Sequence, residues 1–288
     1  MKIRINNRKP RIQRPKEGPL SRRSLLELSL FSTFTFIFSA LLMQFLLTVI
    51  GMLLLKYFGL KFQYSLFHIT FLSHSNTRWS AGMIYLVFGS GPLLLSAAGV
   101  ILLLVLKNLK MAGWKTKLIL TWLAFLFLNA LPCGILAGTL FFDGFGMAFF
   151  WAVNSFIIRG ILALVVLAAL VLLSRFWYRL FLKSAYTTTF LDSSETQKTF
   201  IVSVFLKPWI AGVIILMGFN FPFKEWYWPV FLLSLGYMAV TLIGSQALNR
   251  KPRIKKSDKQ IFTSRTQMVF VAIALVLIWV AGNVKITF

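Results

Sequence analysis

The feature that most constrains this fold is a series of apolar runs that are too long for a soluble domain. From Leu25 to Leu55 the chain is largely apolar and carries a single acid, Glu27. A helix over this run is about 45 Å long, which exceeds the roughly 30 Å hydrocarbon core of a bilayer. The run therefore predicts one tilted membrane-spanning helix with an interfacial first turn.

Composition and the remaining apolar runs extend this prediction to the whole chain. Of the 288 residues, 58% are hydrophobic and 13% are charged, whereas a soluble domain has about 45–50% apolar and about 25% charged residues. We expect an all-α polytopic membrane protein with about seven transmembrane helices. Besides the first, these helices are expected at about 83–106, 118–140, 146–174, 199–219, 229–248 and 267–284.

Two segments depart from this regular pattern. Residues 56–80 alternate weakly between apolar and polar side chains, which predicts a short β-hairpin in the first extramembrane loop. The fourth run, 146–174, is about 43 Å long if continuous, so it is tilted or broken, and Asn154, Arg159 and Gly160 are places for a break. We expect residues 175–199 to form a loop with an interfacial aromatic start.

The chain divides into a basic arm (1–24), a membrane core (25–145) and additional transmembrane helices with basic loops (146–288). The arm contains three prolines and cannot bury a core, so it is predicted to be extended and solvated. Its role is either a topology signal that touches anionic lipid or a docking element for ribosomal RNA or an acidic partner. Its basic residues are Lys2, Arg4, Arg8, Lys9, Arg11, Arg14, Lys16, Arg22 and Arg23.

The distribution of positive charge predicts the orientation. The arm and the alternate loops at 107–117, 175–199 and 249–266 hold 24 of the 31 Lys and Arg residues. Because cytoplasmic loops carry the excess of positive charge, we expect a bacterial-type inner-membrane protein with its amino terminus in the cytoplasm and its carboxyl terminus outside.

The stretch from Leu128 to Phe149 is the best candidate for a packed core or a functional site. It combines Asn129, Pro132, Gly138 and Asp143 within an apolar run. Helix breakers and polar groups are tolerated at membrane depth only where protein or a water-filled cavity satisfies the freed groups. Further candidates are Asn154 and Arg159.

Arg159 has two interpretations. A charge in the middle of a continuous fourth helix is costly and marks a functional site. If residues 144–153 re-enter the membrane instead, Arg159 lies near the outer interface and its side chain can extend towards water.

No complete catalytic or cofactor-binding set is present in the sequence, so we predict a protein that is not an enzyme and has no cofactor or metal. His68 and His74 stand in the first loop without an acid or cysteine nearby to complete a zinc site. Cys133 is the only cysteine, which excludes a disulfide framework.

Parts of residues 45–145 resemble the site-2 protease family of intramembrane zinc metalloproteases. The segment Lys56–Leu60 resembles the sequence after that family's HExxH motif, and the residues Gly91-Pro92 resemble its GP helix. The residues at the spacing of the family's third motif, which supplies an aspartate to the zinc, are Asn129, Pro132, Leu136 and Gly138.

The resemblance lacks the family's metal ligands. The HExxH positions are Leu47, Thr48, Val49, Ile50 and Gly51, and Ala137 replaces the aspartate of the third motif. Zinc hydrolysis needs about three such ligands and an activated water. If the resemblance reflects common descent, it implies a pseudoprotease.

We therefore expect a non-enzymatic accessory or scaffold subunit of a larger membrane assembly, holding a client or partner helix. The alternatives are a transporter or channel for a weakly polar or lipid-like solute, and an atypical metalloprotease that uses His68, His74 and Asp143. The expected partners are membrane lipids with anionic headgroups and at least one membrane protein, with ribosome or RNA contact through the arm and no DNA.

Overall fold

The structure is a computed structural model, and it describes residues 22–65, 68–71, 79–109, 113–142, 144–186, 188–219, 235–237 and 286–287. In chain order the elements are α1 (Arg22–Tyr57), β1 (Phe62–Ser65), β2 (His68–Phe71), α2 (Ala81–Ile84), the π-helix η1 (Tyr85–Gly89), α3 (Ser90–Asn108), α4 (Trp114–Leu140), α5 (Phe145–Ala152), α6 (Phe156–Leu182), the 3₁₀ helix η2 (Thr188–Leu191), α7 (Ser194–Ile201), the π-helix η3 (Val202–Leu206), α8 (Lys207–Phe219) and β3 (Ile286–Thr287).

Within the described residues, five helices are long and apolar enough to cross a membrane. They cover Ser24–Tyr57, Ala81–Asn108, Trp114–Leu140, Phe156–Leu182 and Ser194–Gly218. The chain is therefore a helical, multi-pass membrane protein. The expected sixth and seventh spans, 229–248 and 267–284, lie outside the described residues except for 235–237, so the predicted count of seven stays a prediction.

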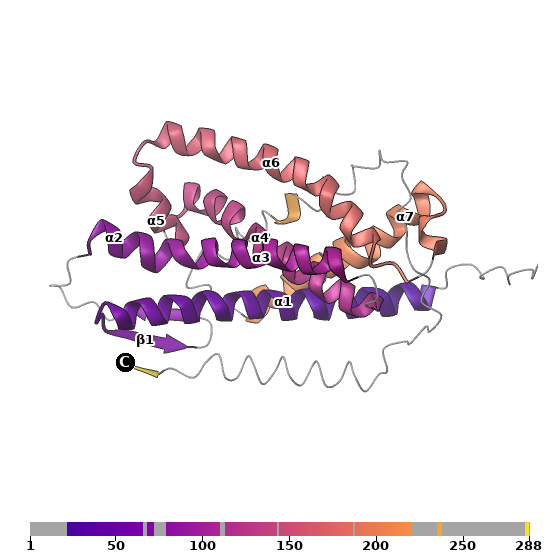
Figure 1. Cartoon of the computed structure of the whole chain (residues 1–288), viewed down its shortest axis with the longest axis horizontal. Helices are drawn as coiled ribbons and strands as arrows, with labels where there is room; N and C mark the ends of the chain where they lie inside the picture. The colour runs from indigo at the N-terminus through magenta and orange to yellow at the C-terminus, as the bar shows by residue number, and fades with distance from the viewer. Residues whose placement is uncertain are drawn as a thin grey trace, which may run out of the picture.

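The spans run roughly along one long axis, and short elements gather at both ends of the bundle (Figure 1). The strand β1 lies at one end with α2 and α5, while the start of α1 and the helix α7 lie at the other end. The helices α3 and α4 have the most extensive mutual contact, and α1 contacts both of them and α8.

A small antiparallel sheet follows α1. β1 pairs with β2, with Phe62 opposite Phe71 and Ser65 opposite His68. β1 also pairs with β3, with Tyr64 opposite Ile286. The sheet rests on the end of α1, because a Cβ atom placed on Gly51 would lie 3.0 Å from the Cδ1 atom of Ile69.

The long fourth run is broken, which was one of the two geometries that its length predicted. Helix α5 ends at Ala152, helix α6 begins at Phe156, and the connection between them contains Asn154. The prediction of a loop over 175–199 is wrong for both of its ends. Helix α6 continues to Leu182 and α7 begins at Ser194.

The reason for this correction is burial. The aromatic residues after Arg175 were expected to lie at the membrane interface, but Trp177 and Phe181 are fully buried. They pack against α4, so tertiary contacts extend the helix past the position where its sequence becomes mixed. The start of α7 carries a capping box, in which Ser193 and Thr196 exchange side-chain and backbone hydrogen bonds.

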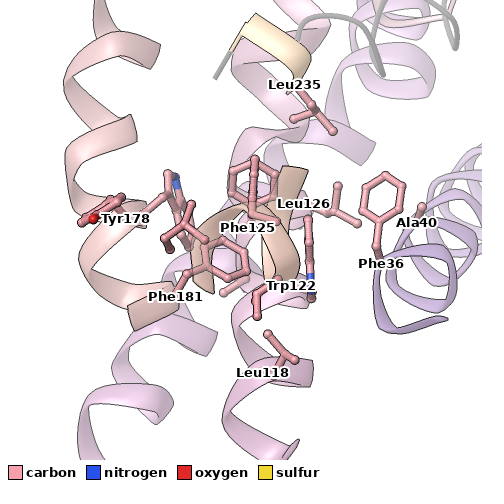
Figure 2. Close-up of a cluster of buried hydrophobic side chains, with 14 of the residues drawn as sticks. Phe36, Ala40, Leu118, Trp122, Phe125, Leu126, Tyr178, Phe181 and Leu235 are labelled. Atoms are coloured by element: carbon pink, nitrogen blue, oxygen red, sulfur yellow. The ribbon is translucent and has the colours of Figure 1, made fainter. Parts of the chain in front are cut away.

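An aromatic cluster from α1, α4, α6 and η3 forms the centre of the bundle, and Figure 2 shows part of it. The rings of Trp122 and Phe205 are stacked with their centroids 5.0 Å apart. Phe125 meets the ring of Trp177 edge-on at 5.1 Å, and Phe36 contacts Trp122 at 5.0 Å. Lipid tails are as apolar as these side chains, so the gain comes from close packing and ring geometry, at about 0.5–1.5 kcal/mol for each ring pair.

Candidate functional site

The backbone hydrogen bond that Pro132 removes from the continuous helix α4 is replaced by one from a side chain of α3. Pro132 has no N–H group, so the carbonyl of Leu128 loses its partner within the helix. The hydroxyl of Ser96 lies 3.2 Å from that carbonyl and 3.3 Å from the carbonyl of Phe127, and it accepts a hydrogen bond from the N–H of Leu131 at 3.2 Å. A hydroxyl group from a neighbouring helix thus bonds the backbone carbonyl that the proline leaves without a partner.

The backbones of α3 and α4 approach each other closely at this point. A Cβ atom on Gly99 would lie 2.5 Å from the backbone nitrogen of Leu128, so only glycine fits there. About two helical turns earlier in α3, a Cβ atom on Gly91 would lie 2.9 Å from the Cδ2 atom of Leu47 in α1. Small residues of α3 therefore bring α1, α3 and α4 into direct contact.

A similar arrangement occurs at Pro208 in α8. Pro208 has no N–H group to donate to the carbonyl of Val204, four residues earlier in the π-helix η3, and this carbonyl accepts a hydrogen bond from the hydroxyl of Ser32 in α1. Ser32 in turn accepts a hydrogen bond of 2.8 Å from Nε1 of Trp122 in α4. One hydroxyl thus links three separate segments inside the aromatic cluster.

Asn129 is fully buried in α4, near Pro132. Its Nδ2 atom donates a hydrogen bond of 2.7 Å to the carbonyl of Phe125. Its Oδ1 atom has no hydrogen-bond partner within the described residues. An enclosed acceptor without a donor costs about 1–3 kcal/mol, so this oxygen is the main polar anomaly of the stretch.

Helix α5 folds back onto the end of α4. The reversal uses Gly144, whose φ of 53° favours glycine. Beyond it, a Cβ atom on Gly138 would lie 2.9 Å from the Cα atom of Gly146, so the two helices touch through their glycines. Asp143, the acid of this turn, lies outside the described residues.

Arg159 lies in the first turn of α6 and is enclosed, with 9% of its surface exposed. Its guanidinium carbon is 4.0 Å from the centre of the Phe150 ring in α5, a cation–π contact. Phe142 meets that ring edge-on at 4.6 Å. The break in the fourth run thus places Arg159 at a helix end, but the side chain is enclosed and does not extend to solvent. Asn154 is exposed nearby in the connection.

The structure therefore separates the predicted site residues into two groups. Asn129, Pro132 and Gly138 lie along α4, where α3 and α5 pack on them, and Asn154 and Arg159 lie at the start of α6. The proposed role of this stretch as a packed core or a site stays open for Asp143.

Other predicted residues are not tested. Residues 1–21 of the arm and His74 lie outside the described residues, and Arg22, Arg23 and His68 are described by their backbone only. In the described part of the chain, no group of three or more His, Cys, Asp or Glu side chains is placed to hold a metal ion.

The sequence analysis missed Ser32, Ser96 and Phe150. A signal for the two serines was present, because a proline inside a span frees the carbonyl four residues earlier and so requires a donor from elsewhere. Which of the many Ser and Thr residues supplies that donor depends on helix packing. Nothing local marks Phe150 among the other phenylalanines.

In comparisons with known proteins, no family model, no curated protein and no solved structure matches this chain.

Proposed function

We propose that this chain is a non-enzymatic scaffold subunit of a larger assembly in a bacterial-type inner membrane, where it holds a partner or client helix. The observation that carries the proposal is that the proline and glycine residues of the stretch 128–149 lie at helix–helix contacts. Ser96 bonds the carbonyl that Pro132 frees, Gly99 lies against Leu128, and Gly146 lies against Gly138. The residues that most resemble a site in the sequence thus serve helix packing.

The partner surface in this proposal is formed by the outer rows of α3 and α6. Large apolar side chains are exposed on both helices, including Leu94 and Ile101 on α3 and Ile157 and Leu164 on α6. Such rows face lipid in a free subunit and accept a further helix in an assembly.

The proposed ancestry is a degenerate site-2 protease scaffold. Two packing observations support it. The segment at the HExxH positions contacts the GP-like helix through Leu47 and Gly91. Ala137, at the position of the family's zinc-binding aspartate, is fully buried.

The proposed orientation places the start of α1 and α7 in the cytoplasm. Described cations gather at that end of the bundle, where Lys115 lies over the rings of Phe31 and Trp114. Lys183 directly follows the end of α6 and Lys198 lies in α7, so the two lysines stand on either side of η2. This distribution agrees with the excess of positive charge expected on the cytoplasmic side.

The scaffold role is tested by mild-detergent extraction followed by mass spectrometry of co-purifying proteins. We expect a near-stoichiometric companion whose retention by the full chain falls with added salt, and whose retention is also lowered by deletion of residues 2–21. A matched variant keeps the arm's length and replaces its Lys and Arg residues before position 20 with Gln.

Equal loss in both variants assigns the contact to charge. Retention that nuclease treatment abolishes assigns it to RNA. A chain that purifies alone under all conditions contradicts the scaffold proposal.

A second candidate is a transporter or channel for a weakly polar solute, and the unpartnered Oδ1 atom of Asn129 favours it. Polar groups of this kind at membrane depth commonly mark solute pathways. If the function is transport, Asn129→Ala and Asp143→Asn abolish uptake of the solute in vesicles, while Ser39→Ala, a change at another buried polar residue, does not. Unchanged flux in both variants contradicts this candidate.

A further inference from the structure

We propose that the start of α6 binds the phosphate group of an anionic phospholipid, with Arg159 as its main ligand. The proposal does not rest on the scaffold or transport role, although its apolar surround shares Ile157 with the proposed partner surface of α6. It rests on two separate features of this end of the bundle: an enclosed cation with no acid near it among the described residues, and a helix amino terminus without a side-chain cap.

The first feature is the isolation of the Arg159 charge. The Nε atom of Arg159 is enclosed and has no hydrogen-bond partner within the described residues. The acids that the structure describes are Glu27, near the start of α1, Asp192, just before α7, and Glu195, in the first turn of α7. These elements lie at the opposite end of the bundle (Figure 1), and the 27-residue helix α6 alone is about 40 Å long.

The second feature is the uncapped amino terminus of α6. The backbone carbonyl of Ser155 accepts a hydrogen bond from the backbone N–H of Arg159. The N–H groups that precede Arg159 in the first turn of α6 therefore have no acceptor within the helix. The side chain of Ser155 makes no capping hydrogen bond. Because helical side chains lean towards the amino terminus of their helix, the guanidinium and these amides can donate hydrogen bonds to the same ligand. Backbone donors and the positive end of the helix dipole there favour an anion.

The ring of Phe150 fixes the guanidinium in place. The cation–π contact at 4.0 Å covers one face of the guanidinium plane and leaves the donors at its edge for a ligand. Bidentate hydrogen bonding by a guanidinium suits phosphate oxygens in particular.

A lipid is the favoured source of the phosphate because apolar surface surrounds the site. Phe156 is 76% exposed and Ile157 is 72% exposed, and both lie in the same turn as Arg159. Trp151, which is also exposed, lies in the last turn of the preceding helix α5, and tryptophan is enriched at membrane interfaces. Acyl chains can thus lie along α6 while the headgroup meets its amino terminus.

The test is thermal unfolding of the full chain in a mild non-ionic detergent, titrated with phosphatidylglycerol. The variants are Arg159→Met, Arg159→Lys and the matched control Arg175→Met, which removes an exposed arginine from the same helix. We expect phosphatidylglycerol to raise the unfolding temperature of the wild type and of Arg175→Met. Arg159→Met is expected to need about tenfold more lipid, because a hydrogen bond to a charged group is lost, and Arg159→Lys is expected to be intermediate.

Three outcomes overturn the proposal. An unchanged lipid response in Arg159→Met shows that the headgroup binds elsewhere. An equal response to inorganic phosphate at the same concentration shows that the ligand is a small anion and no lipid. A lower unfolding temperature of Arg159→Met in lipid-free detergent shows that the guanidinium already has a counter-charge within the chain. The proposal requires the opposite sign, since removal of an uncompensated enclosed charge stabilises the protein.

Discussion

At the scale of single residues, hydroxyl groups from a neighbouring helix bond the carbonyls that lie four residues before Pro132 and Pro208. Ser96 satisfies the carbonyl that Pro132 frees, and Ser32 satisfies the carbonyl that Pro208 frees. Neither serine lies on the helix that it repairs. At these two prolines, the carbonyl that lacks a partner in its own helix is bonded by a neighbouring helix. The missing helical hydrogen bond is therefore replaced by a tertiary one.

Ser32→Ala should lower the free energy of unfolding by about 1–2 kcal/mol, because it removes the partner of both Trp122 Nε1 and the Val204 carbonyl. The measurement is unfolding in mixed micelles followed by tryptophan fluorescence. The matched control is Ser39→Ala, which removes a fully buried hydroxyl that bonds only the Thr35 carbonyl of its own helix. Equal costs for the two variants would contradict a linking role for Ser32.

At the scale of elements, close backbone approach fixes how α3, α4 and α5 pack. In lipid there is little hydrophobic driving force between helices, so small residues that permit close contact gain in importance. Gly99 admits the backbone of α4, and Gly138 and Gly146 admit each other. Helices α3, α4 and α5 are thereby held together without a large side chain at these contacts.

Gly99→Ala should lower the free energy of unfolding by about 1–3 kcal/mol, because its new methyl group meets the backbone of Leu128. Gly160→Ala should raise it by about 0.5–1 kcal/mol, because nothing lies within 4 Å of its new methyl group and alanine favours a helix. Both are measured by thermal unfolding in the same detergent. Changes of the same sign in the two variants would show that helix propensity, and not the α3–α4 contact, controls the result.

At the scale of the whole molecule, the two ends of the bundle carry different secondary-structure elements. One end carries the sheet, α2 and α5, and the other carries the start of α1 and α7 (Figure 1). The aromatic cluster between them takes residues from both sides of residue 145, so the first and second halves of the sequence share one core. Any partner that binds α3 or α6 therefore meets a single packed body.

The proposed orientation predicts the labelling of single cysteines in intact cells. In a Cys133→Ala background, Lys61→Cys should react with a membrane-impermeant maleimide, because Lys61 is exposed at the sheet end. Lys198, which is exposed in α7, should react as Lys198→Cys only after the cells are permeabilised. The reverse pattern would invert the topology.

The sequence by itself determined the membrane class and the approximate positions of four of the five described spans, and it left a break near Asn154 as one of two geometries for the fourth run. Each follows from a local property: hydropathy over about 20 residues, or a run that is too long for a bilayer. The helix over residues 175–182 was missed because its mixed sequence is helical only through the burial of Trp177 and Phe181.

The tertiary structure alone decided which groups meet. The hydroxyl of Ser32 and the carbonyl of Val204 are 172 positions apart in the chain, and no local pattern pairs them. The same holds for the ring of Phe150 under Arg159 and for the enclosed oxygen of Asn129. The physical reason is that a hydrogen bond or a ring contact depends on the packing of whole helices, whereas hydropathy and helix length are properties of each segment alone.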